Sequence, residues 1–254
     1  MHFCITRSGE DNSASYLVSA GGAFSSTLIP ALENIMSQMW PVAGFIVLVA
    51  QGCQPLPPGD LTAIAPAGET LPVGNVCLIR GWQDLYSSGV DRLASELQQS
   101  GVRAHVYRAA QWREVDRALA RQYRGVADRQ PLVLIGFSYG ADDVVRIASD
   151  LKSAGVAVDL LITIDPVTPP PVSSNVRLTY NYFQTNGVWD VFPWFRGVPL
   201  RSAGAPQLIN VDIRRQRPDL LEPDTAHANI AANPKLHREI IKKVLAVCPP
   251  RNSN

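Results

Sequence analysis

Residues 132–140 read Leu-Val-Leu-Ile-Gly-Phe-Ser-Tyr-Gly, an uncharged apolar run that ends in a G-x-S-x-G pentapeptide. The apolar run predicts a buried strand. A helix is predicted directly after it, because apolar residues recur at helical spacing, namely Val144, Ile147, Ala148 and Leu151. The glycines on either side of Ser138 permit a turn in which larger side chains would collide. Such a turn holds the serine hydroxyl clear of the backbone, where it can attack a carbonyl group.

The composition fits a single domain of enzyme size. The chain has 254 residues, 46% of them hydrophobic, so it can bury a substantial core. Its formal net charge of +1 provides no electrostatic reason to expect a nucleic acid or an acidic partner. The four cysteines lack the spacing of metal ligands, and we expect neither a metal nor a cofactor. Cys77 is expected to be a buried thiol, with a Cys77–Cys248 disulfide as an open alternative.

The first 53 residues differ from the rest and are interpreted as an N-terminal extension. They contain an uncharged apolar block at 41–50, which is too short to span a bilayer but has the length of a signal-peptide core. Some 40 residues precede this block, whereas a signal core lies near the start of a chain. One interpretation is that translation begins at one of two internal methionines, Met36 or Met39.

The residues that follow the apolar block suggest processing. Residues 50–52 read Ala-Gln-Gly and directly precede Cys53. A signal peptidase recognises small residues at such positions. Cys53 would also suit a lipoprotein signal. Gln51 and the lack of a leucine three residues before the cysteine depart from the usual lipoprotein pattern. We expect an exported protein, periplasmic or membrane-anchored through Cys53. If the block is a buried N-terminal helix, the protein is cytoplasmic. Residues 54–73, rich in Pro, Gly and Ala, are expected to be a linker.

From residue 74 to 248, strand-like and helix-like segments alternate and predict one folded domain. Strands are predicted at 76–79, 104–106, 132–135, 158–164, 176–183 and 207–211. Ser88 and Asp91 are a plausible capping pair for the first helix, and Asn233-Pro234 is expected to begin the last one. Strands joined through helices pair in parallel with right-handed crossovers. The predicted fold class is therefore α/β, a doubly wound, mainly parallel open sheet.

A serine nucleophile needs a histidine base and a carboxylate that orients the base. Only two histidines follow Ser138. His237 lies three residues into the last helix among charged neighbours and is expected to be solvated, whereas His227 lies in a loop after the last strand and is the expected base. Asp165 ends the strand after the serine's helix, where open α/β sheets place functional groups. Asp190, after the next strand, is the alternative acid.

From about residue 73 to 247 the chain resembles an α/β-hydrolase of the serine esterase, lipase and thioesterase type. The G-x-S-x-G turn matches the nucleophile elbow of that fold. Residues 164–167, Ile-Asp-Pro-Val, are similar to the stretch of pancreatic-type lipases that carries the triad acid. The resemblance implies a catalytic triad of Ser138, Asp165 and His227.

The resemblance also implies an oxyanion hole and a small cap. One oxyanion donor would be the backbone N–H of Tyr139, and the second that of Gly81 or Trp82. Here the chain departs from the family, because it has Arg-Gly-Trp where many members have a His-Gly run. Residues 184–205 are the candidate for a minimal cap or acyl-binding wall, with core packing of a long loop as the alternative. They contain four aromatic residues of interest, Trp189, Phe192, Trp194 and Phe195.

These features together predict a serine hydrolase that cleaves a carboxylic ester or thioester through an acyl-enzyme intermediate. The expected partner is a small-molecule acyl ester or thioester, with no nucleic acid. One alternative is a thioesterase or acyltransferase that acts on carrier-bound acyl groups. Another is a non-catalytic hydrolase-fold binding module.

Overall fold

The computed structural model describes residues 57–65, 73–185 and 197–249. The chain divides into two compact units, and the described residues all belong to the second, which begins at Pro55. The expected signal segment at 41–50, Cys53, Asp190 and the four aromatic residues of the expected cap lie outside the described residues. Within the described part of the chain, no helix is both long and apolar enough to cross a membrane.

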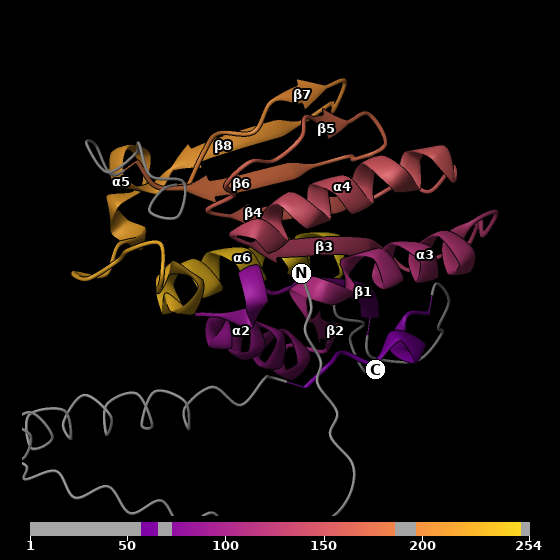
Figure 1. Cartoon of the computed structure of the whole chain (residues 1–254), viewed down its shortest axis with the longest axis horizontal. Coiled ribbons are helices and arrows are strands. Elements are labelled where there is room, and N and C mark those ends of the chain that lie inside the picture. Colours follow the sequence, from indigo (N-terminus) through magenta and orange to yellow (C-terminus); the bar gives the residue numbers. More distant parts are fainter. Residues whose placement is uncertain (1–56, 66–72, 186–196, 250–254) are drawn as a thin grey trace, which may run out of the picture. The chain divides into compact units, whose positions relative to one another are not determined.

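A six-stranded parallel sheet organises the domain, in the order β2-β1-β3-β4-β6-β8 (Figure 1). Its strands are β1 (Val73–Ile79), β2 (Val102–Tyr107), β3 (Leu132–Phe137), β4 (Leu160–Ile164), β6 (Thr179–Phe183) and β8 (Leu208–Asp212). A small second sheet pairs β5 (Val172–Ser173) with β7 (Ser202–Ala203). The chain runs from β1 to the β2 edge and returns past β1 to β3, so the direction of winding reverses there. The predicted doubly wound, parallel α/β fold is confirmed.

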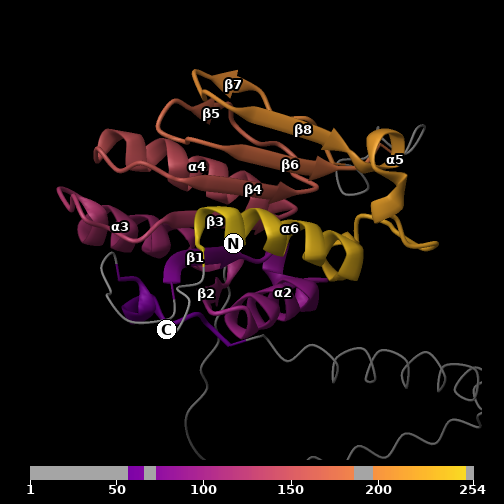
Figure 2. The ribbon, with the colours of Figure 1, turned by 180° about the vertical axis from the view of Figure 1, so that it is seen from behind.

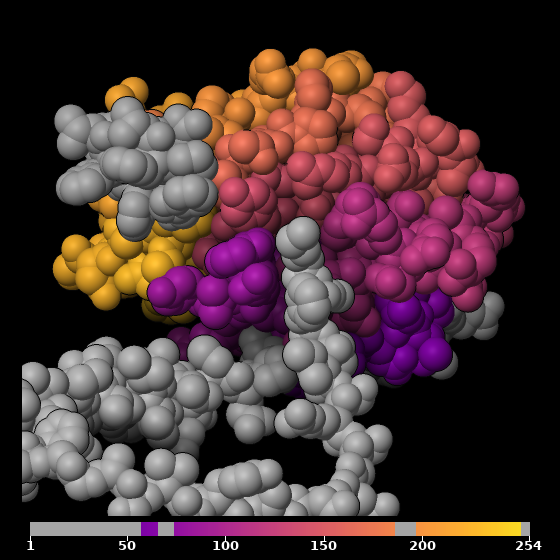
Figure 3. Space-filling view, in the orientation of Figure 1, coloured from indigo at the N-terminus to yellow at the C-terminus, as the bar shows by residue number. Residues whose placement is uncertain are grey.

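Helices cover both faces of this sheet. They are α2 (Ser88–Gln99), α3 (Trp112–Tyr123), α4 (Tyr139–Ser153), the short α5 (Ile213–Gln216) and α6 (Pro234–Val247). Val76 and Leu78 pack with α2 and α6, whereas the alternate residues Cys77 and Ile79 pack with α3 and α4. Figures 1 and 3 show the α3 and α4 side, and Figure 2 shows α6 in front of the other face. Side chains alternate along β1 because successive residues of a strand point to opposite faces.

Short 3₁₀ turns connect these elements: η1 (Leu61–Ala63), η2 (Trp82–Asp84), η3 (Ala109–Gln111), η6 (Pro218–Leu220) and η7 (Ile230–Ala232). Residues 57–65, part of the predicted linker, pack against the domain. Ile64 is 2% exposed and belongs to the core on the α3 and α4 side. Gly59 donates its N–H to the Gln111 side chain at 2.8 Å and accepts from it at 3.1 Å.

The predicted helix starts and cysteine states can be compared with the structure directly. At α6, Asn233 accepts hydrogen bonds from the backbone N–H groups of its first turn, as predicted. At α2 the predicted capping pair is wrong, since no side chain caps this helix and Asp91 instead forms an ion pair with Arg80 at 2.6 Å. Cys77 and Cys248 are both buried and free, so the disulfide left open by the sequence is absent.

Candidate active site

Ser138 lies at the turn between β3 and α4, with φ 55° and ψ −126°. A non-glycine residue at positive φ is strained, and such strain is concentrated at functional sites. The flanking glycines are required by close backbone approach. A Cβ on Gly136 would lie 2.2 Å from the carbonyl oxygen of Gly140, and one on Gly140 would lie 2.2 Å from that of Arg80. The expected strand-turn-helix around the serine is therefore present.

The structure brings together the three side chains that the sequence analysis singled out. Ser138 Oγ lies 3.0 Å from His227 Nε2. His227 Nδ1 lies 3.1 Å from Asp165 Oδ2. Because an ionised carboxylate can only accept, the neutral imidazole must carry its proton on Nδ1. Nε2 is then free to accept the serine proton, which is the tautomer that a general base requires.

Asp165 is fully buried and directly follows β4. Its carboxylate accepts the backbone N–H of Gln184 at 2.8 Å and the Gln184 side-chain amide at 3.0 Å, in addition to His227. Gly197 lies so close that a Cβ there would sit 2.2 Å from Asp165 Oδ1. A carboxylate that accepts several hydrogen bonds in a buried site is held in one orientation, so Asp165 can fix the imidazole ring.

Arg214 connects the surroundings of Asp165 to the loop that carries His227. Arg214 donates from Nη2 to the side-chain oxygen of Gln184 at 2.7 Å and to the backbone carbonyl of Thr225 at 2.6 Å. Thr225 lies two residues before His227. One guanidinium therefore orients the amide that supports Asp165 and also holds the loop that carries His227. The sequence contains no local pattern that would reveal this contact, since the pairing spans 30 residues.

Asp142, in the first turn of α4, supports the site from the other side. Its buried carboxylate accepts the backbone N–H groups of Val167 at 2.9 Å and Thr168 at 2.8 Å. Burial raises the pKa of Asp142, and these hydrogen bonds oppose that rise. The contact ties the segment after Asp165 to the helix that carries Ser138, and sequence reasoning did not single it out.

Backbone N–H groups for an oxyanion are available next to the serine. Tyr139 is the first residue of α4, and its N–H makes no hydrogen bond to another described residue, as expected at a helix N-terminus. Of the two expected second donors, Gly81 donates its N–H to Ser87 Oγ at 3.0 Å. The N–H of Trp82 makes no hydrogen bond to any described residue. Of these two N–H groups, only that of Trp82 therefore lacks a hydrogen-bond partner among the described residues.

His237 is separate from this site. Its side chain is fully buried, which makes the expectation of a solvated residue wrong. Nδ1 lies 2.9 Å from Glu96 Oε2 of α2, and Nε2 donates to the carbonyl oxygen of Ala231 at 2.7 Å. The charged neighbours in sequence were misleading, because they lie on the other faces of α6. His237 thus joins α6 to α2 and η7.

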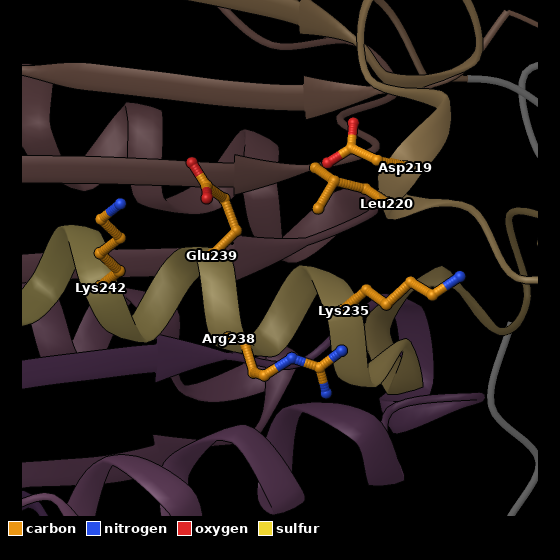
Figure 4. A pocket seen from close by; sticks show the side chains of 6 residues that line it. All are labelled: Asp219, Leu220, Lys235, Arg238, Glu239 and Lys242. Carbon is orange, nitrogen blue, oxygen red and sulfur yellow. The ribbon is translucent and has the colours of Figure 1, made fainter.

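A charged pocket lies elsewhere, along α6 and η6 (Figure 4). Its lining contains none of the triad residues; it consists of Asp219, Leu220, Lys235, Arg238, Glu239 and Lys242. The two acidic residues of this pocket, Asp219 and Glu239, both form ion pairs with Arg217.

Over residues 57–65, 73–185 and 197–249, no group of three or more His, Cys, Asp or Glu side chains is arranged to hold a metal ion.

Comparison with known proteins shows similarity to hydrolase structures. No protein-family model and no curated protein sequence matches the chain. Dienelactone hydrolase from Anabaena variabilis is 11% identical with a TM-score of 0.41, over 72% of this chain and 87% of its own. A protein described as a hydrolase of the alpha/beta superfamily from Xanthomonas campestris is 16% identical with a TM-score of 0.36, over 67% and 99%. The esterase domain of a Rhodothermus marinus protein is 15% identical with a TM-score of 0.35, over 70% and 90%.

Similarity at this level carries no information about the substrate. The chain's own features define its fold: a parallel sheet with reversed winding beside β1, and a strained serine between β3 and α4. This is the α/β-hydrolase fold.

Proposed function

We propose that this protein is a serine hydrolase that cleaves a carboxylic ester or thioester through an acyl-enzyme intermediate. The observation that carries the proposal is the continuous hydrogen-bonded series from Ser138 Oγ to His227 at 3.0 Å and from His227 to Asp165 at 3.1 Å. A fold used only for binding has no physical need for a strained serine, an imidazole and a buried carboxylate in one hydrogen-bonded line.

In the first half of the reaction, Ser138 Oγ forms a bond to the substrate carbonyl carbon and its proton passes to His227 Nε2. The Asp165 carboxylate stabilises the imidazolium that results. The carbonyl oxygen becomes an oxyanion, to which the backbone N–H groups of Tyr139 and Trp82 donate. The bond from carbon to the leaving oxygen or sulfur then breaks, and His227 Nε2 returns the proton to the departing alcohol or thiol.

In the second half, a water molecule replaces the leaving group. His227 Nε2 accepts a proton from the water as its oxygen attacks the acyl-enzyme carbonyl carbon. The bond to Ser138 Oγ breaks, the serine recovers its proton from His227, and a carboxylic acid is released. The groups described here hold and move every proton that this sequence of steps requires.

A panel of p-nitrophenyl esters and acyl thioesters of increasing chain length tests this proposal. We expect turnover of at least one substrate class by the wild-type protein and none above background by Ser138→Ala, which removes only the nucleophilic oxygen. Ser153→Ala, at the exposed end of α4, is the matched control and should retain wild-type activity. Full activity in a folded Ser138→Ala variant would contradict the proposal.

A further inference from the structure

The loop between β1 and α2 presents apolar side chains to solvent beside the candidate nucleophile. Trp82 is 58% exposed, Leu85 41% and Tyr86 70%. Elsewhere among the described residues, the only large hydrophobic side chain of comparable exposure is Ile209, at 39% on β8. Single exposed apolar residues are ordinary in proteins, but a cluster of them marks a surface that binds something. We call the segment 81–87, which carries these three side chains, the apolar loop.

The backbone of the apolar loop is strained and pinned in place. Gln83, Asp84 and Tyr86 have positive φ angles of 49°, 61° and 54°. Such conformations are strained and persist only where the surrounding structure enforces them. Here the Asp84 carboxylate accepts from Arg108 Nε at 2.9 Å and from the N–H of Ala109 at 3.0 Å.

A second set of contacts closes the loop at its base. Ser87 Oγ accepts from the N–H of Gly81 and donates to the carbonyl oxygen of Leu85, each at 3.0 Å. The strained backbone of this loop therefore lowers the stability of the fold, and the loop nevertheless points its apolar side chains outward. Solvent exposure of these side chains contributes nothing to folding, so a binding role explains the arrangement better than a structural one.

The position of the apolar loop indicates which part of a substrate it meets. The loop follows β1, and a Cβ on its Gly81 would lie 3.3 Å from the Cβ of Ser138. In the sheet, β1 and β4 are the two neighbours of β3, and Asp165 follows β4. The apolar loop and the Asp165–His227 pair therefore lie on opposite sides of Ser138.

The chemistry then assigns the two substituents of the substrate carbonyl carbon. His227 must protonate the leaving group, so the leaving group has to lie on the histidine side of Ser138. The acyl substituent is directed to the other side, toward the apolar loop. We infer that the apolar loop is a binding surface for the apolar acyl chain of the ester or thioester. This inference rests on the proposed hydrolase function and adds to it a preference for longer acyl chains.

The test compares a short and a long acyl ester. The double variant Leu85→Ser/Tyr86→Asn removes apolar surface without touching the N–H of Trp82, and asparagine tolerates the positive φ of residue 86. We expect kcat/KM for p-nitrophenyl octanoate to fall about tenfold or more, because each apolar side chain loses its burial against the acyl chain. For p-nitrophenyl acetate, kcat/KM should change by less than about twofold, since a methyl group is too short to gain from the same contact.

Two controls separate the outcomes. Ile209→Ser removes an exposed apolar residue far along the sheet and should leave both values unchanged, and Tyr86→Phe should retain the preference for octanoate. Equal loss of activity on both esters, or an unchanged preference for octanoate in the double variant, would overturn this inference while leaving the hydrolase proposal intact. Hydrolysis of neither ester, nor of any acyl thioester, by the wild-type protein would overturn both.

Discussion

Replacement of Asp165 by asparagine exchanges one carboxylate oxygen for an NH₂ group. The groups that contact this carboxylate are all hydrogen-bond donors. The carboxylate accepts from the backbone N–H of Gln184 at 2.8 Å, from the Gln184 side chain at 3.0 Å and from His227 Nδ1 at 3.1 Å. An amide has one acceptor oxygen and one donor nitrogen. If its oxygen keeps the bond to the fixed backbone N–H, its NH₂ group faces His227 Nδ1.

Two donors cannot face each other, so His227 must adopt the tautomer with its proton on Nε2. In that tautomer Nε2 has no lone pair for the proton of Ser138. Gln184 could turn its amide to relieve its own clash, but its NH₂ group would then face the guanidinium of Arg214, which now donates to the amide oxygen at 2.7 Å. The substitution therefore keeps the shape of the site and removes the base.

The expected loss in kcat is on the order of 10⁴-fold, the size typical of this substitution in serine triads. That loss corresponds to about 5.5 kcal/mol of transition-state stabilisation. The assay is steady-state kinetics on the best ester of the panel, with thermal unfolding to verify the fold. Asp190→Asn, which changes the other acid that the sequence left open, is the control and should be mild. A loss of less than tenfold in Asp165→Asn together with a severe loss in Asp190→Asn would refute this reasoning.

Two further outcomes follow from the surroundings of the site and of α3. Gln184→Leu removes the amide that donates to Asp165 but keeps the backbone N–H. Steady-state kinetics should show kcat lowered about tenfold to a hundredfold at nearly unchanged KM, because a loss of this size corresponds to one hydrogen bond to a charged group. A change in KM alone would contradict this role. Burial raises the pKa of Asp116 to about 6, and its Oδ1 has no hydrogen-bond partner among the described residues. Because this value lies above the unfolded value of about 3.9, ionisation between about pH 4 and pH 6 destabilises the folded state. Asp116→Asn should therefore raise the unfolding temperature at pH 7.5 by about 2–4 °C. This corresponds to a gain in the free energy of unfolding on the order of 1 kcal/mol after allowance for solvent screening. At pH 4 the substitution should have little effect. Equal shifts at both pH values would be inconsistent with this assignment.

Local signals in the sequence were enough to predict the sheet and the serine turn. The strand before Ser138 and the helix after it have clear periodicity, and the G-x-S-x-G pattern reports a steric requirement that the structure shows at Gly136 and Gly140. The order of the strands follows from chain connectivity, because helices between strands impose parallel pairing. That connectivity also placed Asp165 and His227 at the same edge of the sheet, where they meet.

Contacts between distant segments could not be predicted in this way. Nothing near Gln184 or Arg214 in the sequence signals that they support Asp165, because their contact exists only after β6 and α5 are folded. His237 was misjudged for a similar reason, since its partner Glu96 lies 141 residues away. The sequence also does not reveal that the N–H of Gly81, one of the two candidate second oxyanion donors, is hydrogen-bonded to Ser87.

The most direct test of the central claim is covalent labelling of the purified, folded protein with a fluorophosphonate probe, followed by intact-mass and peptide mass spectrometry. Such a probe reacts with a serine only when a base removes its proton and an oxyanion hole accepts the developing charge. The account predicts one added probe per chain, located on Ser138, with no addition to Ser138→Ala and strongly slowed addition to His227→Ala. Absence of labelling in the folded wild-type protein, or labelling at a serine other than Ser138, would contradict it.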